Sequence, residues 1–123
     1  MEISFPILVL EKDSGDILQF ESIAEMQGYL ERMDVENDEY AAWDANGHPV
    51  TLVVQEPTWL KVIPASEKGA PDLPHSLKSF AEARRVVLTD TERELTPVAL
   101  YELIIAKGGI GRRPAGIFRS RSG

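Results

Sequence analysis

The 123-residue sequence contains no cysteine and only two histidines, His48 and His75. Without thiols the chain can form no disulfide, thiolate metal centre or cysteine nucleophile, and this composition is typical of a reducing compartment, so we expect the cytoplasm. The two histidines are 27 residues apart and lack the short spacing of a zinc site. The sequence therefore predicts no metal and no cofactor.

The sequence also lacks the motifs of nucleophilic and phosphate-binding enzymes. No G-x-S-x-G or H-E-x-x-H segment is present, and Ser76, beside His75, is explained as a helix cap. The glycines at 108, 109 and 111 follow a predicted helix end, which does not fit a P-loop or a dinucleotide fingerprint. We predict no catalytic residue, although a small hydrolase that uses paired carboxylates stays an alternative because 20 acidic residues leave many pairings open.

Long apolar runs are absent as well. A membrane-spanning helix needs about 18 apolar residues, and the best run, residues 98–106, is short and contains Glu102. Residues 1–6 have no basic region ahead of their apolar residues, so no secretory signal is expected. We predict a soluble protein without a membrane partner.

Basic residues are scarce in the first half. Residues 1–60 contain 13 acidic residues and two basic ones, Lys12 and Arg32, so their net charge is −11. Residues 61–123 contain seven acidic and 11 basic residues, so their net charge is +4. This asymmetry indicates a cationic partner for the first half, an anionic one for the second, or contact between the halves within a chain or across a homodimer. The pI of about 4.8 argues against nucleic-acid binding.

β-prone runs and turn residues predict a sheet. The runs are residues 7–10, 17–20, 40–44, 50–55 and 59–63. Asn46-Gly47 lies between the third and fourth runs and is a strong signal for a two-residue type I′ turn, so we expect a central hairpin there. The fifth run fits either another antiparallel strand or a bent continuation of the fourth.

Capping signals predict three helices. Ser22 and Glu25 match a capping box, and the apolar stripe that follows consists of Ile23, Met26, Leu30 and Met33. Ser76 can cap a second helix that continues to Leu88. Thr96 and Pro97 can begin a third helix, which Gly108 ends.

Together these elements predict an α+β fold. We expect a mostly antiparallel five-stranded sheet in the order ββαβββ, with one packed helix and two C-terminal helices. The predicted segments are an acidic sheet domain (1–63), a proline-rich crossing (64–75), a two-helix extension of the same domain (76–108) and a flexible basic tail (109–123).

An acidic run connects the first helix to the third strand. It is not an EF-hand, because Glu39 stands where that loop needs glycine and Ala45 where it needs glutamate. We predict a partner-binding surface instead, with two aromatic anchors. Its candidate residues are Asp34, Glu36, Asp38, Glu39, Tyr40, Trp43 and Asp44. The competing interpretation places Trp43 and Trp59 in the core or under the proline-rich crossing.

Residues 20–52 contain the segments Y-L-E, D-V-E-N-x-E-Y and W-D-A-x-G. With these segments the first half resembles small bacterial proteins that are encoded beside secreted toxins and regarded as their immunity partners. The resemblance implies a non-enzymatic inhibitor, and an acidic surface would attract a cationic toxin domain by long-range steering.

The inhibitor interpretation and the homo-oligomer alternative require different contacts. The acidic surface is available only if Arg84, Arg85, Arg112 and Arg113 do not pair with the acids of residues 34–44. A structural or regulatory homo-oligomer would instead require the second-half helices to dock on another protomer.

Overall fold

The computed structural model describes residues 2–65 and 71–108. The predicted basic tail, with Arg112 and Arg113, and residues 66–70 of the predicted crossing lie outside this part of the chain.

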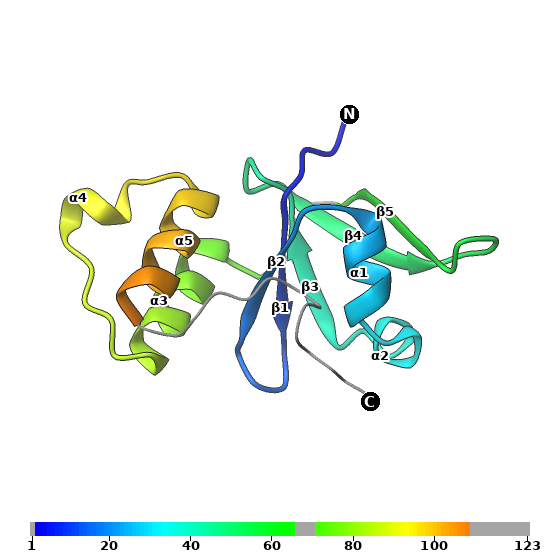
Figure 1. Ribbon diagram of the computed structural model, residues 1–123, viewed down its shortest axis with the longest axis horizontal. Coiled ribbons are helices and arrows are strands. Elements are labelled where there is room, and N and C mark those ends of the chain that lie inside the picture. The colour runs from blue at the N-terminus through cyan, green and yellow to red at the C-terminus, as the bar shows by residue number, and fades with distance from the viewer. Residues whose placement is uncertain (1, 66–70, 109–123) are drawn as a thin grey trace.

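The fold is an antiparallel five-stranded sheet with helices on both faces, which confirms the predicted α+β class (Figure 1). The strands are β1 (Ile7–Glu11), β2 (Ile17–Phe20), β3 (Tyr40–Trp43), β4 (Pro49–Val54) and β5 (Leu60–Pro64), arranged in the order β2-β1-β3-β4-β5. The helices are α1 (Ile23–Tyr29), α2 (Arg32–Glu36), α3 (Leu73–Ala83), α4 (Asp90–Arg93) and α5 (Pro97–Gly108). The fifth run is therefore a separate antiparallel strand, paired with β4.

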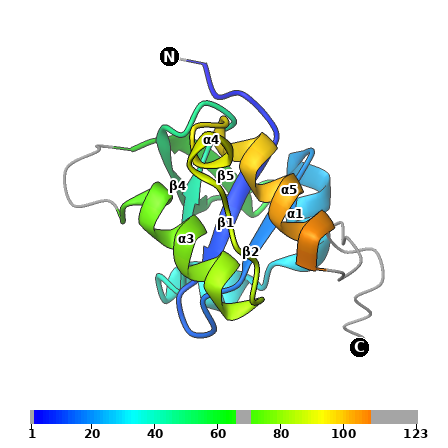
Figure 2. The same cartoon turned by 90° about the vertical axis from the view of Figure 1, so that its left-hand side faces the viewer.

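Strand β1 is buried on both faces. Successive side chains of a strand point to opposite faces, so Ile7 and Val9 pack on the side of α1 and α2, whereas Leu8 packs on the side of α3 and α5. All three side chains are 0 % exposed. Figure 2 looks onto the layer formed by α3, α4 and α5, with the sheet behind it.

The first predicted helix is interrupted. Ser22 caps α1 as expected, and its side chain accepts a hydrogen bond from the Glu25 backbone N–H at 3.1 Å. The helix ends at Leu30, whose extended backbone (φ −78°, ψ 150°) turns the chain and buries the Leu30 side chain. Residues after this turn form the separate helix α2, so the prediction that Met33 continues the buried stripe is wrong: Met33 is 67 % exposed.

The central hairpin is confirmed, but its turn is longer than predicted. The backbone N–H of Asp44 donates to the carbonyl of His48, and that of Gly47 donates to the carbonyl of Asp44. Gly47 has φ +84°, whereas Asn46 is not left-handed. This is a three-residue loop of the kind that ends in a left-handed glycine, so the predicted two-residue type I′ turn is wrong.

The second predicted helix begins earlier than expected. Helix α3 starts at Leu73, and its cap is Asp72, whose side chain accepts from the backbone N–H of His75 at 3.3 Å. Ser76 is therefore inside the helix, and the proline-rich crossing ends three residues sooner than its composition indicated. Proline is tolerated in the first turn, where the N–H has no helical partner, so Pro74 does not prevent the helix.

After α3, capping residues begin two further helices, α4 and α5. Helix α3 ends before Arg85, which is left-handed (φ 59°), so it does not continue to Leu88 as predicted. Thr89 and Glu92 form a capping box for α4, which was not predicted. Helix α5 begins at Pro97 as predicted, and the Thr96 side chain accepts from the Ala99 backbone N–H at 3.4 Å.

Helices α3 and α5 pack on the chain's own sheet. Their buried side chains share one apolar cluster with Leu8, Ile17 and Trp43 from the strands. Phe80 of α3 stacks on Tyr101 of α5 with ring centroids 5.5 Å apart. The buried faces of these helices thus pack against the chain's own sheet.

Candidate partner-binding surface

The exposed acidic run lies on α2 and its connection to β3. Helix α2 ends in a Schellman motif, in which the Asp38 N–H donates to the carbonyl of Val35 and the Glu39 N–H to that of Asp34. Asp38 occupies the left-handed position of this motif (φ 59°), which is more often glycine. The motif reverses the chain into β3 and directs the Asp38 side chain into solvent, where it is 86 % exposed.

Met33 is the apolar centre of this surface. Val35 anchors α2 in the core, so Met33, two residues earlier on the short helix, faces solvent. Glu36 follows Met33 at i+3 and therefore lies beside it on the helix surface. We use the name α2 surface for Met33, Asp34, Glu36, Asp38 and Glu39; Glu36 and Asp38 are exposed, whereas Asp34 and Glu39 are half-buried.

Tyr40 forms the boundary between the α2 surface and the sheet. Its hydroxyl donates to Asp34 Oδ2 at 3.4 Å. Burial, helped by the negative charges of Asp34 and Glu11, raises the pKa of Tyr40 to about 12 from its ordinary value of 10.0, although a backbone hydrogen bond with Glu31 opposes the shift. Tyr40 is therefore a neutral side chain over the physiological range, half-buried and partly accessible to a partner.

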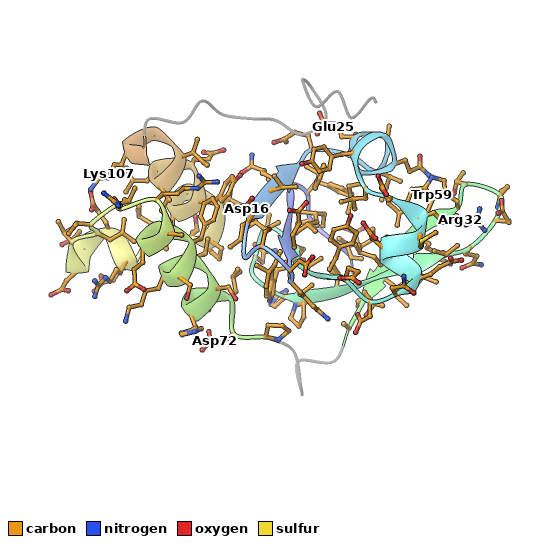
Figure 3. The ribbon with its side chains drawn as sticks, turned by 90° about the horizontal axis from the view of Figure 1, so that it is seen from below. Asp16, Glu25, Arg32, Trp59, Asp72 and Lys107 are labelled. Carbon is orange, nitrogen blue, oxygen red and sulfur yellow. The ribbon has the colours of Figure 1, made fainter. Side chains whose placement is uncertain are left out.

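The two cations of the first half are both at this end of the molecule. Lys12 Nζ lies 3.2 Å from Asp38 Oδ2, and Arg32 lies 3.1 Å from Glu56 Oε2 and 3.8 Å from Glu36 Oε2. The side chains of these pairs are 40–86 % exposed. Pairs of this kind contribute about 0–1 kcal/mol, so a cationic partner could displace them at small cost. Figure 3 shows Arg32 at the end of the molecule opposite Lys107.

Two of the predicted surface residues are buried. Trp43 is 2 % exposed and packs between the sheet and α3, which is the position that the competing interpretation gave it. Asp44 is 1 % exposed, and its carboxylate accepts hydrogen bonds from the backbone N–H groups of Asn46 (2.9 Å), His48 (3.0 Å) and Ser4 (3.4 Å). Both residues therefore shape the fold and do not belong to the α2 surface.

Trp59 is half-buried, and it packs against the apolar cluster beneath α1. Its backbone is left-handed (φ 36°), a region that bulky residues rarely adopt. The loop that carries Trp59 is held to α1 and α2 by the Arg32–Glu56 pair and by a hydrogen bond from the Gln27 side chain to the carbonyl of Thr58. This loop therefore flanks the α2 surface.

Sequence reasoning missed Met33 and the loop residue Glu56. Met33 fitted the helical spacing of a buried stripe, so periodicity gave no sign of its exposure. Asn37 and Asp38, four and five residues after Met33, indicated where a helix ends, because both types tolerate the left-handed position, but they did not indicate the turn at Leu30 that exposes Met33.

Arg84 does not pair with the α2 surface, although Arg32 lies 3.8 Å from Glu36 and Lys12 lies 3.2 Å from Asp38. Arg84 Nη2 lies 3.6 Å from Asp16 Oδ1, at the end of the first hairpin, and the guanidinium group covers the Phe80 ring at 4.3 Å from its centroid. Figure 3 places Asp16 between the C-terminal helices and the sheet, away from Arg32. Arg112 and Arg113 lie outside the described residues.

Over residues 2–65 and 71–108, no group of three or more histidine or acidic side chains is arranged to hold a metal ion. In the same part of the chain no helix is long and apolar enough to cross a bilayer.

A scan against protein-family models found no match, and searches of curated proteins and of solved structures found no significant match.

Proposed function

We propose that this protein is a non-enzymatic binding protein of the inhibitor or immunity type, which presents the α2 surface to a cationic protein in the cytoplasm of a bacterium. A secreted toxin's cationic domain is the partner that the resemblance of residues 20–52 implies. The proposal rests on one observation: Met33, 67 % exposed, lies on the short helix α2 together with Asp34 and Glu36, and the exposed Asp38 follows in the connection to β3.

The physical chemistry of this arrangement suits recognition of a cationic surface. A methionine side chain adapts its shape to an apolar partner, and central apolar contacts dominate the affinity of many interfaces. The surrounding carboxylates would raise the rate of encounter with a cation and repel anionic competitors. The acids and the apolar side chain would therefore act on different kinetic steps.

Charge reversal at two different places tests whether the association rate depends on the α2 surface or only on the total net charge of the protein. The variant Glu36→Lys, Asp38→Lys, Glu39→Lys changes the net charge by +6, and the matched control Glu82→Lys, Asp90→Lys, Glu94→Lys does the same on the side of α3 and α4. With cytochrome c as a cationic probe in stopped-flow experiments, we expect the first variant to associate about tenfold more slowly at low salt and the control about as fast as wild type. Near 1 M salt the difference should vanish.

Equal slowing in both triple variants would refute the proposal, because the rate would then report only the total charge. The substitution Met33→Ser tests the apolar contact, and we expect it to raise the dissociation rate while leaving the association rate unchanged. Circular dichroism of each variant verifies that the fold is retained.

A further inference from the structure

Met33 is the one methionine side chain that is exposed over residues 2–65 and 71–108. The sequence contains three methionines and no cysteine, so methionine thioethers are the only sulfur of this protein. Met1 lies outside the described residues, and Met26 is 0 % exposed in the cluster beneath α1, whereas Met33 is 67 % exposed on α2. The fold therefore protects one thioether and presents another to solvent.

An exposed thioether reacts with peroxides. The Met33 sulfur can attack one oxygen of hydrogen peroxide with a lone pair; the O–O bond breaks, and the second oxygen leaves as water after a proton transfer. Sulfur loses two electrons, which the peroxide gains, and the product is methionine sulfoxide. The sulfoxide is polar, so it no longer offers the apolar contact of the thioether.

The charges around Met33 favour a neutral oxidant. The four acidic residues of the α2 surface outnumber the two cations that pair with it, Lys12 and Arg32. A surface with this excess of negative charge repels anionic oxidants, whereas it leaves uncharged hydrogen peroxide free to approach. Hydrogen peroxide is therefore the oxidant class that suits this site.

The fold can carry an oxygen atom on Met33 without being disrupted. Val35 anchors α2 in the core, and Figure 1 shows α2 at the outside of the molecule, remote from α3 and α5. The hydrogen bond that Met33 accepts from the Asn37 N–H at 2.9 Å uses its backbone carbonyl, which oxidation does not alter. Oxidation of Met26 would instead place a polar group inside the packed core.

From the exposure of Met33 within the α2 surface, we propose that it is an oxidation site, at which hydrogen peroxide forms the sulfoxide and so weakens binding of the cationic partner. The effect on binding rests on the proposed function, whereas the oxidation itself does not. The carboxylates are unchanged, so the loss falls on the dissociation rate. Reductases reverse the change, because two thiols become a disulfide while the sulfoxide oxygen leaves as water.

Peroxide treatment of the full chain tests the site. After wild type is exposed to hydrogen peroxide and the oxidant is removed with catalase, peptide mapping should locate an increase of about 16 Da at Met33 well before any at Met26. Stopped-flow experiments with cytochrome c, added after the oxidant is gone, should then show dissociation about fivefold faster and association unchanged. Methionine sulfoxide reductases with dithiothreitol should restore both the mass and the rate.

Two variants serve as matched controls, and each is compared with its own untreated sample. Met33→Leu keeps an apolar side chain that cannot take up oxygen, so peroxide should leave its dissociation rate unchanged. Met26→Leu removes the buried thioether and should respond to peroxide as wild type does. Met1 is present in both variants, so oxidation there cannot explain a difference between them.

Oxidation of Met26 as fast as that of Met33 would overturn the proposal, because the fold would then not direct the reaction. So would an equal increase in the dissociation rates of treated wild type and treated Met33→Leu, or a wild-type rate that stays constant once Met33 is oxidised. If that rate stays constant while Met33→Ser dissociates faster than wild type, the oxidation proposal fails and the α2 surface stands. If neither changes, the apolar contact at Met33 is itself refuted.

Discussion

At the scale of single residues, Asp44 organises the turn on which the central hairpin depends. Its buried carboxylate accepts from backbone N–H groups within the turn and from Ser4, near the N-terminus. His48 Nδ1 lies 3.8 Å from the same carboxylate. One side chain therefore connects two segments that are far apart in the sequence.

We expect Asp44→Ala to lower the free energy of unfolding by about 2 kcal/mol, because it leaves buried donors without an acceptor. Asp44→Asn keeps one acceptor oxygen and should cost less. The exposed residue Asp13 provides the control, and Asp13→Ala should change stability by less than about 0.5 kcal/mol. Urea denaturation measures all three, and equal effects of Asp44→Ala and Asp13→Ala would contradict the assigned role.

Tyr40 makes stability depend on alkaline pH. The unfolded chain loses the Tyr40 proton near pH 10, whereas the folded chain retains it until about pH 12. The folded state binds the extra proton in this window, so the stability contribution is complete below pH 10 and is lost between pH 10 and 12.

Tyr40→Phe should therefore reduce the fall in stability between pH 10 and 12, measured by urea denaturation at several pH values. Tyrosinate absorbance of the folded protein should show one tyrosine fewer titrating late in the variant. Identical stability profiles for wild type and variant would contradict the assigned pKa.

At the scale of elements, helix starts with purely local signals were predictable. Ser22 with Glu25, and Thr96 with Pro97, lie within one turn of the helices that they begin, and both starts are confirmed. The start of α3 was missed because prolines at 71 and 74 were interpreted as a linker, although Asp72 fits a cap and Pro74 fits a first turn. The high proline content of the segment indicated a linker, whereas the helix start depends on the single residues Asp72 and Pro74.

Substitutions at Asp72 and Ser76 test which of the two residues caps α3. Asp72→Ala should destabilise the protein by about 1 kcal/mol, because the His75 N–H loses its acceptor. Ser76→Ala, inside the helix, should be neutral or slightly stabilising, because alanine has the higher helix propensity. Thermal or urea unfolding of both variants distinguishes the two positions, and the reverse order of effects would restore Ser76 as the cap.

The candidate site was predictable in part for a similar reason. The acids at 34–39 were predicted together on the surface from their order between a helix and a strand, but Asp34 and Glu36 lie within helix α2 and not in a connection. The burial of Trp43 was not decidable locally, because it depends on α3 and α5, which begin about thirty residues or more later in the chain. The exposure of Met33 likewise depends on the turn at Leu30, which the helical periodicity of the apolar residues did not predict.

At the scale of the whole molecule, the two tryptophans report on opposite faces of one sheet. Trp43 belongs to the cluster beneath α3 and α5, and Trp59 packs against the cluster beneath α1. Strand β1 contributes side chains to both clusters, so neither can be lost without disrupting the other. The chain should therefore unfold as a single cooperative unit.

Trp43→Phe and Trp59→Phe leave one fluorescent tryptophan each. After allowing for the stability change of each variant, its fluorescence transition in urea should coincide with its own transition by circular dichroism. Separate transitions in either variant would show that one face melts independently of the other.

The sheet with two covered faces also has a consequence for biosynthesis. Residues 1–65 supply all five strands, but the side chains of Leu8, Ile17 and Trp43 acquire their cover only from residues 73–104. While the ribosome is still extending the chain, one apolar face of the sheet has no helices to cover it. Exposed apolar surfaces of this kind aggregate or recruit chaperones. We therefore expect a nascent chain that stalls before α3 to keep this apolar face exposed, and translation through α5 to cover it.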